Sequence, residues 1–141
     1  MTTLYAESSA VLRWLLGASD AHRVERALTI ASVVVTSDLT TTEVGRSLQR
    51  LVLTDQLAGE AGERVWASYS VASQHWHTYR IDDDILVRAR QAFPREPIRT
   101  LDAIHLATAM RHALDIGVPS MLSLDRQVRA NAHALGLPVI P

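Results

Sequence analysis

The stretch MLSLDRQVRANAHALGLPVI, residues 121–140, contains the pattern that decides the fold. Its first part, residues 121–124, is mostly apolar and predicts a short buried strand. Residues 126–135 predict a helix that ends at Gly136, and residues 137–140 predict another strand. Two strands joined by a helix form a right-handed crossover, and they therefore lie parallel in one sheet.

The same alternation of short apolar runs and longer helical stretches extends over the whole chain. Further strands are predicted at residues 2–6, 33–36 and 76–81. Further helices are predicted at residues 9–16, 20–31, 40–53, 58–73 and 100–114, and from Asp83 or Asp84 to Phe93. No repeat, low-complexity tract or linker divides the sequence. We therefore expect one domain, residues 1–141, of the α/β class, with a parallel sheet covered by helices on both faces.

Four side chains have a specific place in this prediction. Asp20 and Thr100 are expected to cap the helices that begin beside them. Trp66 and Val65 are expected to contact the core from the helix at residues 58–73.

Composition excludes several classes of protein. The chain has 141 residues, of which 48% are hydrophobic and 21% are charged, as in soluble globular domains. It has no apolar run long enough to span a membrane and no basic N-terminal start, so we expect a cytoplasmic protein without a signal peptide. Cysteine is absent, which excludes disulfides and thiolate metal sites. The net charge of −1 means that a polyanion would have to be held locally, by arginines or by bound cations.

Four acidic residues from separate segments are expected at one end of the sheet. Glu7 ends the first strand, and Asp125 follows the strand at residues 121–124. Glu43 and Asp102 are expected in the first turns of their helices. Ligands of open parallel sheets bind beyond the carboxyl ends of the strands. Clustered carboxylates repel one another unless they are protonated or bridged by cations, and oxygen ligands without cysteine favour Mg²⁺ or Mn²⁺.

Each of these acids also has a purely structural interpretation. An acid in a first helical turn stabilises the helix dipole without any catalytic role. Glu43 is able to pair with Arg46 or Arg50 on its own helix. His105 lies one helical turn from Asp102 and is interpreted as a structural residue or a phosphate contact rather than a metal ligand.

Four segments resemble successive motifs of a known family. They are LYAESSAVLRWLL, TTTEVGRSL, RTLDAIHLATA and LSLDRQVRANAHALGLPVI, which begin at residues 4, 40, 99 and 122. In order and spacing they resemble the PIN-domain ribonucleases, specifically the VapC-type toxins of toxin–antitoxin pairs. The last two segments are the more specific ones. The resemblance implies a three-layer α/β/α fold with a central, mainly parallel sheet, Mg²⁺-dependent endonucleolytic cleavage of RNA, and a cognate antitoxin that blocks the site.

The resemblance also assigns site residues. The family's acidic site falls on Glu7, Glu43, Asp102 and Asp125, and its two supporting hydroxyls fall on Ser9 and Ser123. Asp102 and Glu7 are the first choices as direct metal ligands, with Glu43 and Asp125 binding through water or a second metal. The family normally has aspartate where this chain has Glu7, and the extra methylene shifts the carboxylate by about one bond length. Because Mg²⁺ requires regular octahedral geometry, Mn²⁺ is a possible substitute.

The resulting hypothesis is a metal-dependent endoribonuclease that acts on RNA, binds an antitoxin through its first helix and forms a homodimer. The helix at residues 58–73 and its neighbours carry more apolar side chains than one sheet face covers, which favours a two-fold contact. The alternative is a PIN-like domain that binds RNA or a protein partner without cutting. A small-molecule binder is disfavoured, because none of the six glycines belongs to a G-x-G-x-x-G loop. The candidates for phosphate contacts are Arg13, Arg46, Arg50 and Arg99, and the default interpretation of each is an arginine solvated on a helix face.

Overall fold

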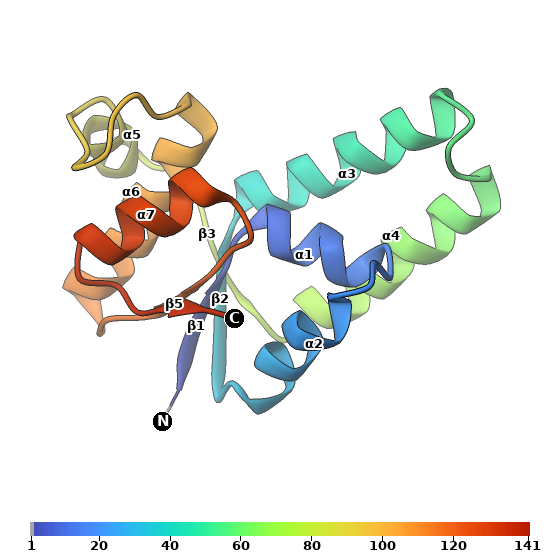
Figure 1. The fold of residues 1–141 in the computed structure, drawn as a ribbon, viewed down its shortest axis with the longest axis horizontal. Helices are drawn as coiled ribbons and strands as arrows, with labels where there is room; N and C mark the ends of the chain where they lie inside the picture. Colours follow the sequence, from blue (N-terminus) through green and yellow to red (C-terminus); the bar gives the residue numbers. More distant parts are fainter. Residues whose placement is uncertain (1) are drawn as a thin grey trace.

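A sheet of five parallel strands lies at the centre of the molecule (Figure 1). The structure, a computed structural model, describes residues 2–141. The strands are β1 Thr3–Ala6, β2 Val33–Ser37, β3 His77–Tyr79, β4 Ser120–Leu122 and β5 Val139–Ile140. Their order in the sheet is β3-β2-β1-β4-β5, so the chain builds one side of the sheet from β1 and then the other. The order in which strands are added thus reverses between β1 and β4. Open α/β sheets bind ligands at such a position.

Helices cover both faces of this sheet. They are α1 Ser8–Leu15, α2 Ala21–Ile30, α3 Asp38–Leu53, α4 Gly59–Ser73, α5 Asp83–Ala89, α6 Thr100–Asp115 and α7 Arg126–Ala134. Figure 1 shows α5, α6 and α7 on one side of the sheet and α1 to α4 on the other. The predicted three-layer α/β/α fold is therefore confirmed. No helix within residues 2–141 has both the length and the apolar character needed to cross a membrane.

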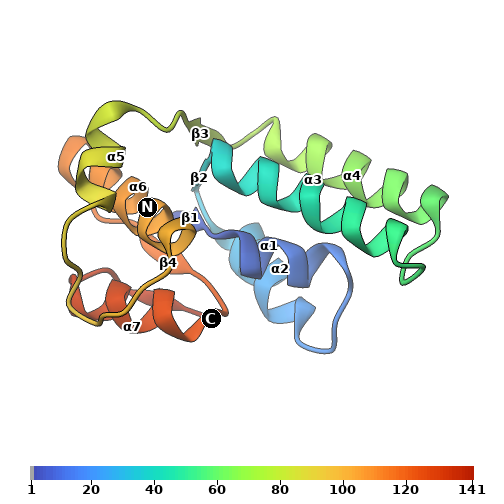
Figure 2. The ribbon, with the colours of Figure 1, turned by 90° about the horizontal axis from the view of Figure 1, so that it is seen from above.

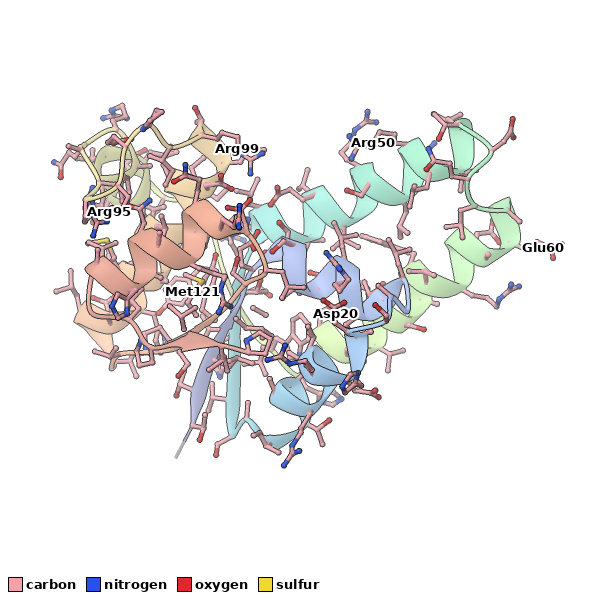
Figure 3. The ribbon with its side chains drawn as sticks, in the orientation of Figure 1. Asp20, Arg50, Glu60, Arg95, Arg99 and Met121 are labelled. Atoms are coloured by element: carbon pink, nitrogen blue, oxygen red, sulfur yellow. The ribbon has the colours of Figure 1, made fainter. Side chains whose placement is uncertain are left out.

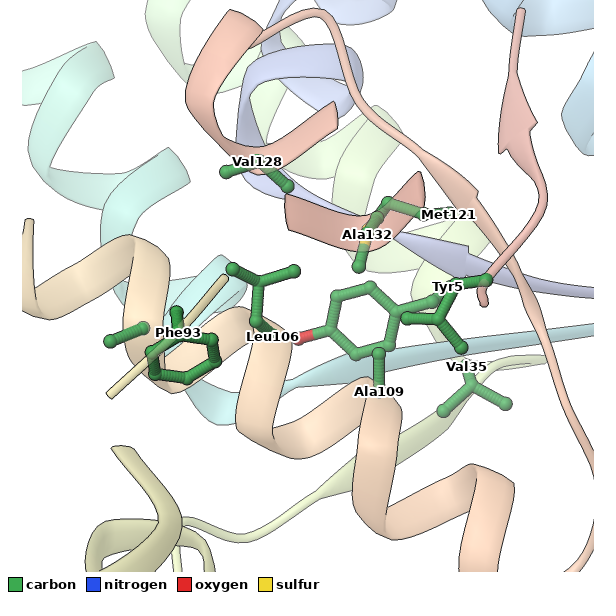
Figure 4. Packing of buried hydrophobic residues seen from close by; sticks show 10 residues of the cluster. Tyr5, Val35, Phe93, Leu106, Ala109, Met121, Val128 and Ala132 are labelled. Carbon is green, nitrogen blue, oxygen red and sulfur yellow. The ribbon is translucent and has the colours of Figure 1, made fainter. Parts of the chain in front are cut away.

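The alternation of side chains along β1 divides the core between the two faces. Successive residues of a strand point to opposite faces. Tyr5 packs against Leu106 and Ala109 of α6 and against Met121 of β4 (Figure 4). Leu4 belongs to a second cluster, formed with α1 and α2 on the other face. The central strand β1 is thus packed on both faces of the sheet. This packing fixes the end of β1, where the candidate site begins.

Helices α3 and α4 run side by side away from the sheet (Figure 2). They approach closely at Gly62, where an added Cβ would lie 2.9 Å from the Val52 side chain. Trp66 and Val65 reach the core as expected: Val65 packs against the buried cluster on this face, and the Trp66 ring lies 5.6 Å from that of Tyr69, although Trp66 is 40% exposed. Tyr69, one helical turn further on, is the fully buried aromatic residue, and its hydroxyl lies 2.8 Å from that of Thr41.

The start of α3 differs from the prediction in a way that affects the site. The helix begins at Asp38 rather than at residue 40, because the Ser37 side chain accepts a hydrogen bond from the Leu39 amide at 3.0 Å. Ser37 is therefore the N-cap. Glu43 consequently lies in the second turn of α3, not in the first turn as predicted. It is too far from the helix start for the dipole to explain its position.

Three other helices differ from the prediction in the residue at the N-cap or in how that residue is used. Asp20 occupies the N-cap position of α2, but its carboxylate pairs with Arg13 at 3.1 Å instead of capping the helix. The helix predicted to begin at Asp83 or Asp84 is capped by Asp82, and it ends at Ala89. Thr100 lies inside α6, and Arg99 occupies the N-cap position. In α5 the neighbouring Asp82 thus takes the capping role, whereas α2 and α6 have no side-chain cap.

The contact between β3 and α6 leads to a pH prediction. The Tyr79 hydroxyl lies 3.0 Å from Nδ1 of His112, and burial lowers the pKa of His112, which His77 lowers further. An unfolded histidine has a pKa of about 6.5, so below that pH the unfolded chain binds more protons than the folded one. The contribution of the neutral His112 to the free energy of unfolding is present above about pH 6.5, and it is lost as the pH falls through the folded-state pKa of His112.

We expect the melting temperature to fall less steeply between pH 7.5 and pH 5.5 in His112→Gln than in the wild type. His22→Gln, which replaces an exposed histidine, is the control and should follow the wild-type curve. Parallel curves for all three proteins would contradict the prediction.

Candidate active site

The Glu7 carboxylate is buried where β1 passes into α1. Its Oε1 accepts hydrogen bonds from the Ser8 hydroxyl at 2.8 Å and from the Ser9 amide at 3.1 Å. Its Oε2 accepts from the Ser123 hydroxyl at 2.7 Å and from the Ser9 hydroxyl. Glu7 is therefore also the N-cap of α1. Four donors fix the orientation of this carboxylate.

The two supporting serines join the ends of β1 and β4. Ser9 Oγ accepts a hydrogen bond from the Leu124 amide at 3.0 Å, and Ser123 Oγ accepts one from the Asp125 amide at 3.1 Å. Both hydroxyls donate to Glu7. The segment that follows β4 is thereby held against the segment that follows β1, which places Asp125 beside Glu7.

His105 links Glu43 of α3 to the buried end of β1. Its Nε2 lies 2.6 Å from Glu43 Oε1 and 3.9 Å from Glu7 Oε1, and its Nδ1 lies 2.9 Å from the Tyr5 hydroxyl. Burial, with a contribution from Glu7, raises the pKa of Tyr5 well above its usual value, so the Tyr5 hydroxyl keeps its proton. An ionised carboxylate only accepts hydrogen bonds, so Nε2 of His105 is the donor in its short contact with Glu43. No ion pair within residues 2–141 joins Glu43 to Arg46 or Arg50.

Arg99 bridges the other two carboxylates. Its Nε donates to Asp102 Oδ2 at 2.9 Å, and its Nη2 donates to Asp125 Oδ2 at 2.8 Å. Figure 3 labels Arg99, which lies where α6 begins. The other Asp125 oxygen, Oδ1, caps α7 by accepting from the Gln127 and Val128 amides. Burial raises the pKa of Asp102, Arg99 opposes this shift, and the charges of Asp125 and Glu7 add to it.

The four predicted carboxylates thus lie at the same end of the sheet, in two pairs that basic groups bridge. His105 stands between Glu7 and Glu43, and Arg99 stands between Asp102 and Asp125. Within the part of the chain that the structure describes, no three His, Asp or Glu side chains form a ready chelating group. The donors fit Mg²⁺ or Mn²⁺ by their chemistry, because carboxylate oxygens are the ligands that these ions prefer. The Arg99 guanidinium contacts Asp102 and Asp125 at once, so these two carboxylates lie close enough to share one positive charge.

Comparison with known proteins identifies the family. The sequence profile of the PIN domain matches residues 4–138. The chain belongs to the PIN domain family. This PIN domain is 34% identical to Ribonuclease VapC46 of Mycobacterium tuberculosis over 140 residues, which cover 99% of the chain and 98% of that protein. The resemblance to VapC-type toxins is therefore confirmed.

Solved structures share the fold of this PIN domain. VapC20 of Mycobacterium tuberculosis, a toxin that cleaves the Sarcin-Ricin loop, superposes with a TM-score of 0.66 and 16% identity, over 98% of this chain and 99% of that one. FitAcB from Neisseria gonorrhoeae superposes with a TM-score of 0.73 and 16% identity, over 98% and 97% of the two chains. At this level of identity, the likeness is one of fold.

Sequence reasoning missed the bridging roles of Arg99 and His105. Both lie three residues from Asp102, one before it and one after it, so helical spacing places all three on one face of α6. That spacing was the available signal. Which carboxylates the two bases contact depends on α3 and α7, which are distant in sequence.

Proposed function

We propose that this PIN domain is a divalent-metal-dependent endoribonuclease and the toxin of a toxin–antitoxin pair. The observation that carries the proposal is the gathering of Glu7, Glu43, Asp102 and Asp125 at the carboxyl end of the sheet. These are the acidic positions on which the likeness to VapC toxins falls. The 34% identity to a ribonuclease over almost the full length of both chains supports the same activity.

Mg²⁺, with Mn²⁺ as a substitute, is the cofactor that we propose. Asp102 and Glu7 would hold it directly, and Glu43 and Asp125 would contribute through water or a second ion. When bound, such an ion lowers the pKa of a coordinated water and neutralises charge on the scissile phosphate. Hydrolysis then needs no side-chain nucleophile.

The protein's own contribution is to fix the orientation of the carboxylates. Ser9 and Ser123 hold Glu7, so that its oxygens keep one orientation at the end of β1. His105 donates to Glu43 and is itself fixed by Tyr5. Residues that orient ligands in this way typically contribute about 10- to 100-fold to metal affinity or activity.

A cognate antitoxin is the partner that we propose. A hollow of about 430 Å³ lies between α1 and α4 and is lined by Trp14, Ala67, Ser68, Val71 and Ala72. Val71 is 62% exposed, so this surface remains largely apolar and open to solvent. A structural relative from Klebsiella pneumoniae, with a TM-score of 0.66, is a toxin–antitoxin complex. A predominantly apolar helix of an antitoxin would fit this hollow.

The test of the proposed activity uses a short single-stranded RNA labelled at one end. We expect internal cuts with Mg²⁺ or Mn²⁺ and none in EDTA, read on a sequencing gel. RNA binding without cleavage in either metal would favour the alternative of a binding module.

We further predict a homodimer. Leu53 and Trp66 are 72% and 40% exposed, and a cavity of about 470 Å³ between α3 and α4 is lined by Leu48, Val52, Gly62 and Trp66 among others. An apolar surface of this kind is typical of a protein–protein contact, and a two-fold dimer is the commonest assembly. Light scattering at tens of micromolar, without antitoxin, should give twice the chain mass. Trp66→Ser should shift the protein toward monomer, and a wild-type monomer would contradict the prediction.

A further inference from the structure

Arg99 combines high exposure with two short ion pairs. Its side chain is 73% exposed, yet it bridges Asp102 in the first turn of α6 and Asp125 at the N-cap of α7. Within residues 2–141, Arg99 is the one side chain that hydrogen-bonds the Asp102 carboxylate. The charge of this otherwise unpaired, buried acid is therefore balanced by a flexible residue at the surface.

The ion pairs of Arg99 with Asp102 and Asp125 are able to open and form again. The guanidinium partner of both ion pairs is exposed, so water is able to solvate it when it leaves, and the long Arg99 side chain loses freedom while it is held in place. The Arg99 guanidinium is able to rotate into solvent without any movement of the backbone, because so much of it is already exposed. Asp125 keeps its N-cap hydrogen bonds to α7 through Oδ1, so only its Oδ2 is released.

The oxygens that Arg99 contacts belong to the carboxylates that we propose as metal ligands. It binds Oδ2 of Asp102 and Oδ2 of Asp125, one from each residue. A divalent cation and a guanidinium within hydrogen-bond distance of the same two oxygens would repel each other strongly. The two cations are therefore alternatives at these atoms.

We propose that Arg99 is an internal counter-ion that competes with the divalent cation for Asp102 and Asp125, so that the cation binds when the guanidinium leaves both carboxylates. The inference rests on the proposed metal-dependent function. Arg99 is a positioning residue in this scheme. It keeps like charges together in the metal-free protein and weakens the affinity for metal.

The test is direct Mn²⁺ binding, measured by electron paramagnetic resonance of the free ion, without RNA. Arg99→Gln should lower the Kd for Mn²⁺ by about three- to tenfold, the range that corresponds to releasing two ion contacts whose guanidinium is exposed. Arg99→Lys should fall between wild type and Arg99→Gln, because an ammonium group is a single point charge and does not form the bidentate bridge.

Arg95→Gln is the matched control. Arg95 lies on the loop that precedes α6 and is exposed (Figure 3), and within the described residues only its backbone groups form hydrogen bonds, to Asn131. The substitution removes the same charge and leaves Asp102 and Asp125 untouched. Its Kd for Mn²⁺ should stay within about twofold of the wild-type value, because exposed charges at a distance are screened by salt.

Thermal unfolding supplies a second measurement. In EDTA, Arg99→Gln should melt below Arg95→Gln, because the repulsion between Asp102 and Asp125 is no longer balanced. Saturating Mn²⁺ should raise its melting temperature by more than that of wild type, since a ligand with a lower Kd stabilises the folded state more at the same concentration.

The possible outcomes separate the two proposals. If wild type binds Mn²⁺ and Asp102→Asn does not, the metal site stands. An unchanged or higher Kd in Arg99→Gln would then overturn the role of Arg99 alone, and would show that it holds the ligands in place. Both proposals fail if wild type and Arg99→Gln do not bind Mn²⁺, or if they bind it and Asp102→Asn leaves that binding unchanged.

Discussion

Asp102→Asn is expected to reduce RNA cleavage by at least about 100-fold while the protein stays folded. The amide keeps the shape of the carboxylate but loses the negative charge that a divalent cation requires. Stability should not fall, because burial and the charges of Asp125 and Glu7 already raise the pKa of Asp102. Removing the charge relieves that cost, although it also weakens the contact with Arg99.

The measurement is single-turnover cleavage at saturating protein, with the melting temperature of each variant recorded beside it. Asp83→Asn is the matched control, since Asp83 is an exposed acid in the first turn of α5, at another helix start. It should cleave like wild type. Cleavage by Asp102→Asn at the wild-type rate would show that Asp102 is not a metal ligand and would remove the main support for the proposed active site.

Glu7 is the second position where a large effect is expected. Its carboxylate accepts four hydrogen bonds, from Ser8, from Ser123 and from the amide and hydroxyl of Ser9. In Glu7→Gln, one of the two oxygens becomes an NH₂ group that faces donors. A buried donor without an acceptor costs about 1–3 kcal/mol, so this variant should melt at a lower temperature. It should also lose cleavage, because the amide neither balances nor strongly binds a cation.

Glu7→Asp should behave differently from Glu7→Gln. Aspartate is a good N-cap and restores the residue that the family normally has at this position, so cleavage should be retained or increased. The carboxylate moves back by about one bond length, which weakens its contact with Ser123 and lowers stability modestly.

The three Glu7 proteins should be compared in single-turnover cleavage over a range of Mg²⁺ and Mn²⁺ concentrations. We expect Mn²⁺ to support the wild type better than Mg²⁺, because it accepts less regular coordination. Ser8→Ala serves as the control, since it removes one donor to Glu7 and keeps the carboxylate. Robust wild-type cleavage that survives in Glu7→Gln would contradict the assignment of Glu7 as a ligand.

Much of the candidate site followed from the position of each acid along the chain. Glu7 comes directly after β1, and Asp125 lies on the short segment that follows β4. These two strands are neighbours in the sheet and parallel, so their carboxyl ends meet at one edge. The prediction was less accurate for Glu43, because it took the start of α3 two residues too late and missed the Ser37 cap.

The sequence by itself determined the α/β class, the parallel sheet and the end of it that carries the acids. These features depend on local periodicity and on the handedness of crossovers. Short stretches such as residues 121–140 are enough to predict both. The likeness of four motifs to VapC-type toxins added the family.

Only the tertiary structure decided how the acids are held. Residues 62 positions apart in sequence meet in the contact between His105 and Glu43, and residues 26 positions apart meet in the contact between Arg99 and Asp125. The Glu7 carboxylate is fixed by Ser123, 116 positions away. Such contacts depend on which strands become neighbours and how the helices dock on them, and no local pattern encodes that. The same reason applies to Trp66 and Tyr69, whose burial depends on where α4 lies against α3.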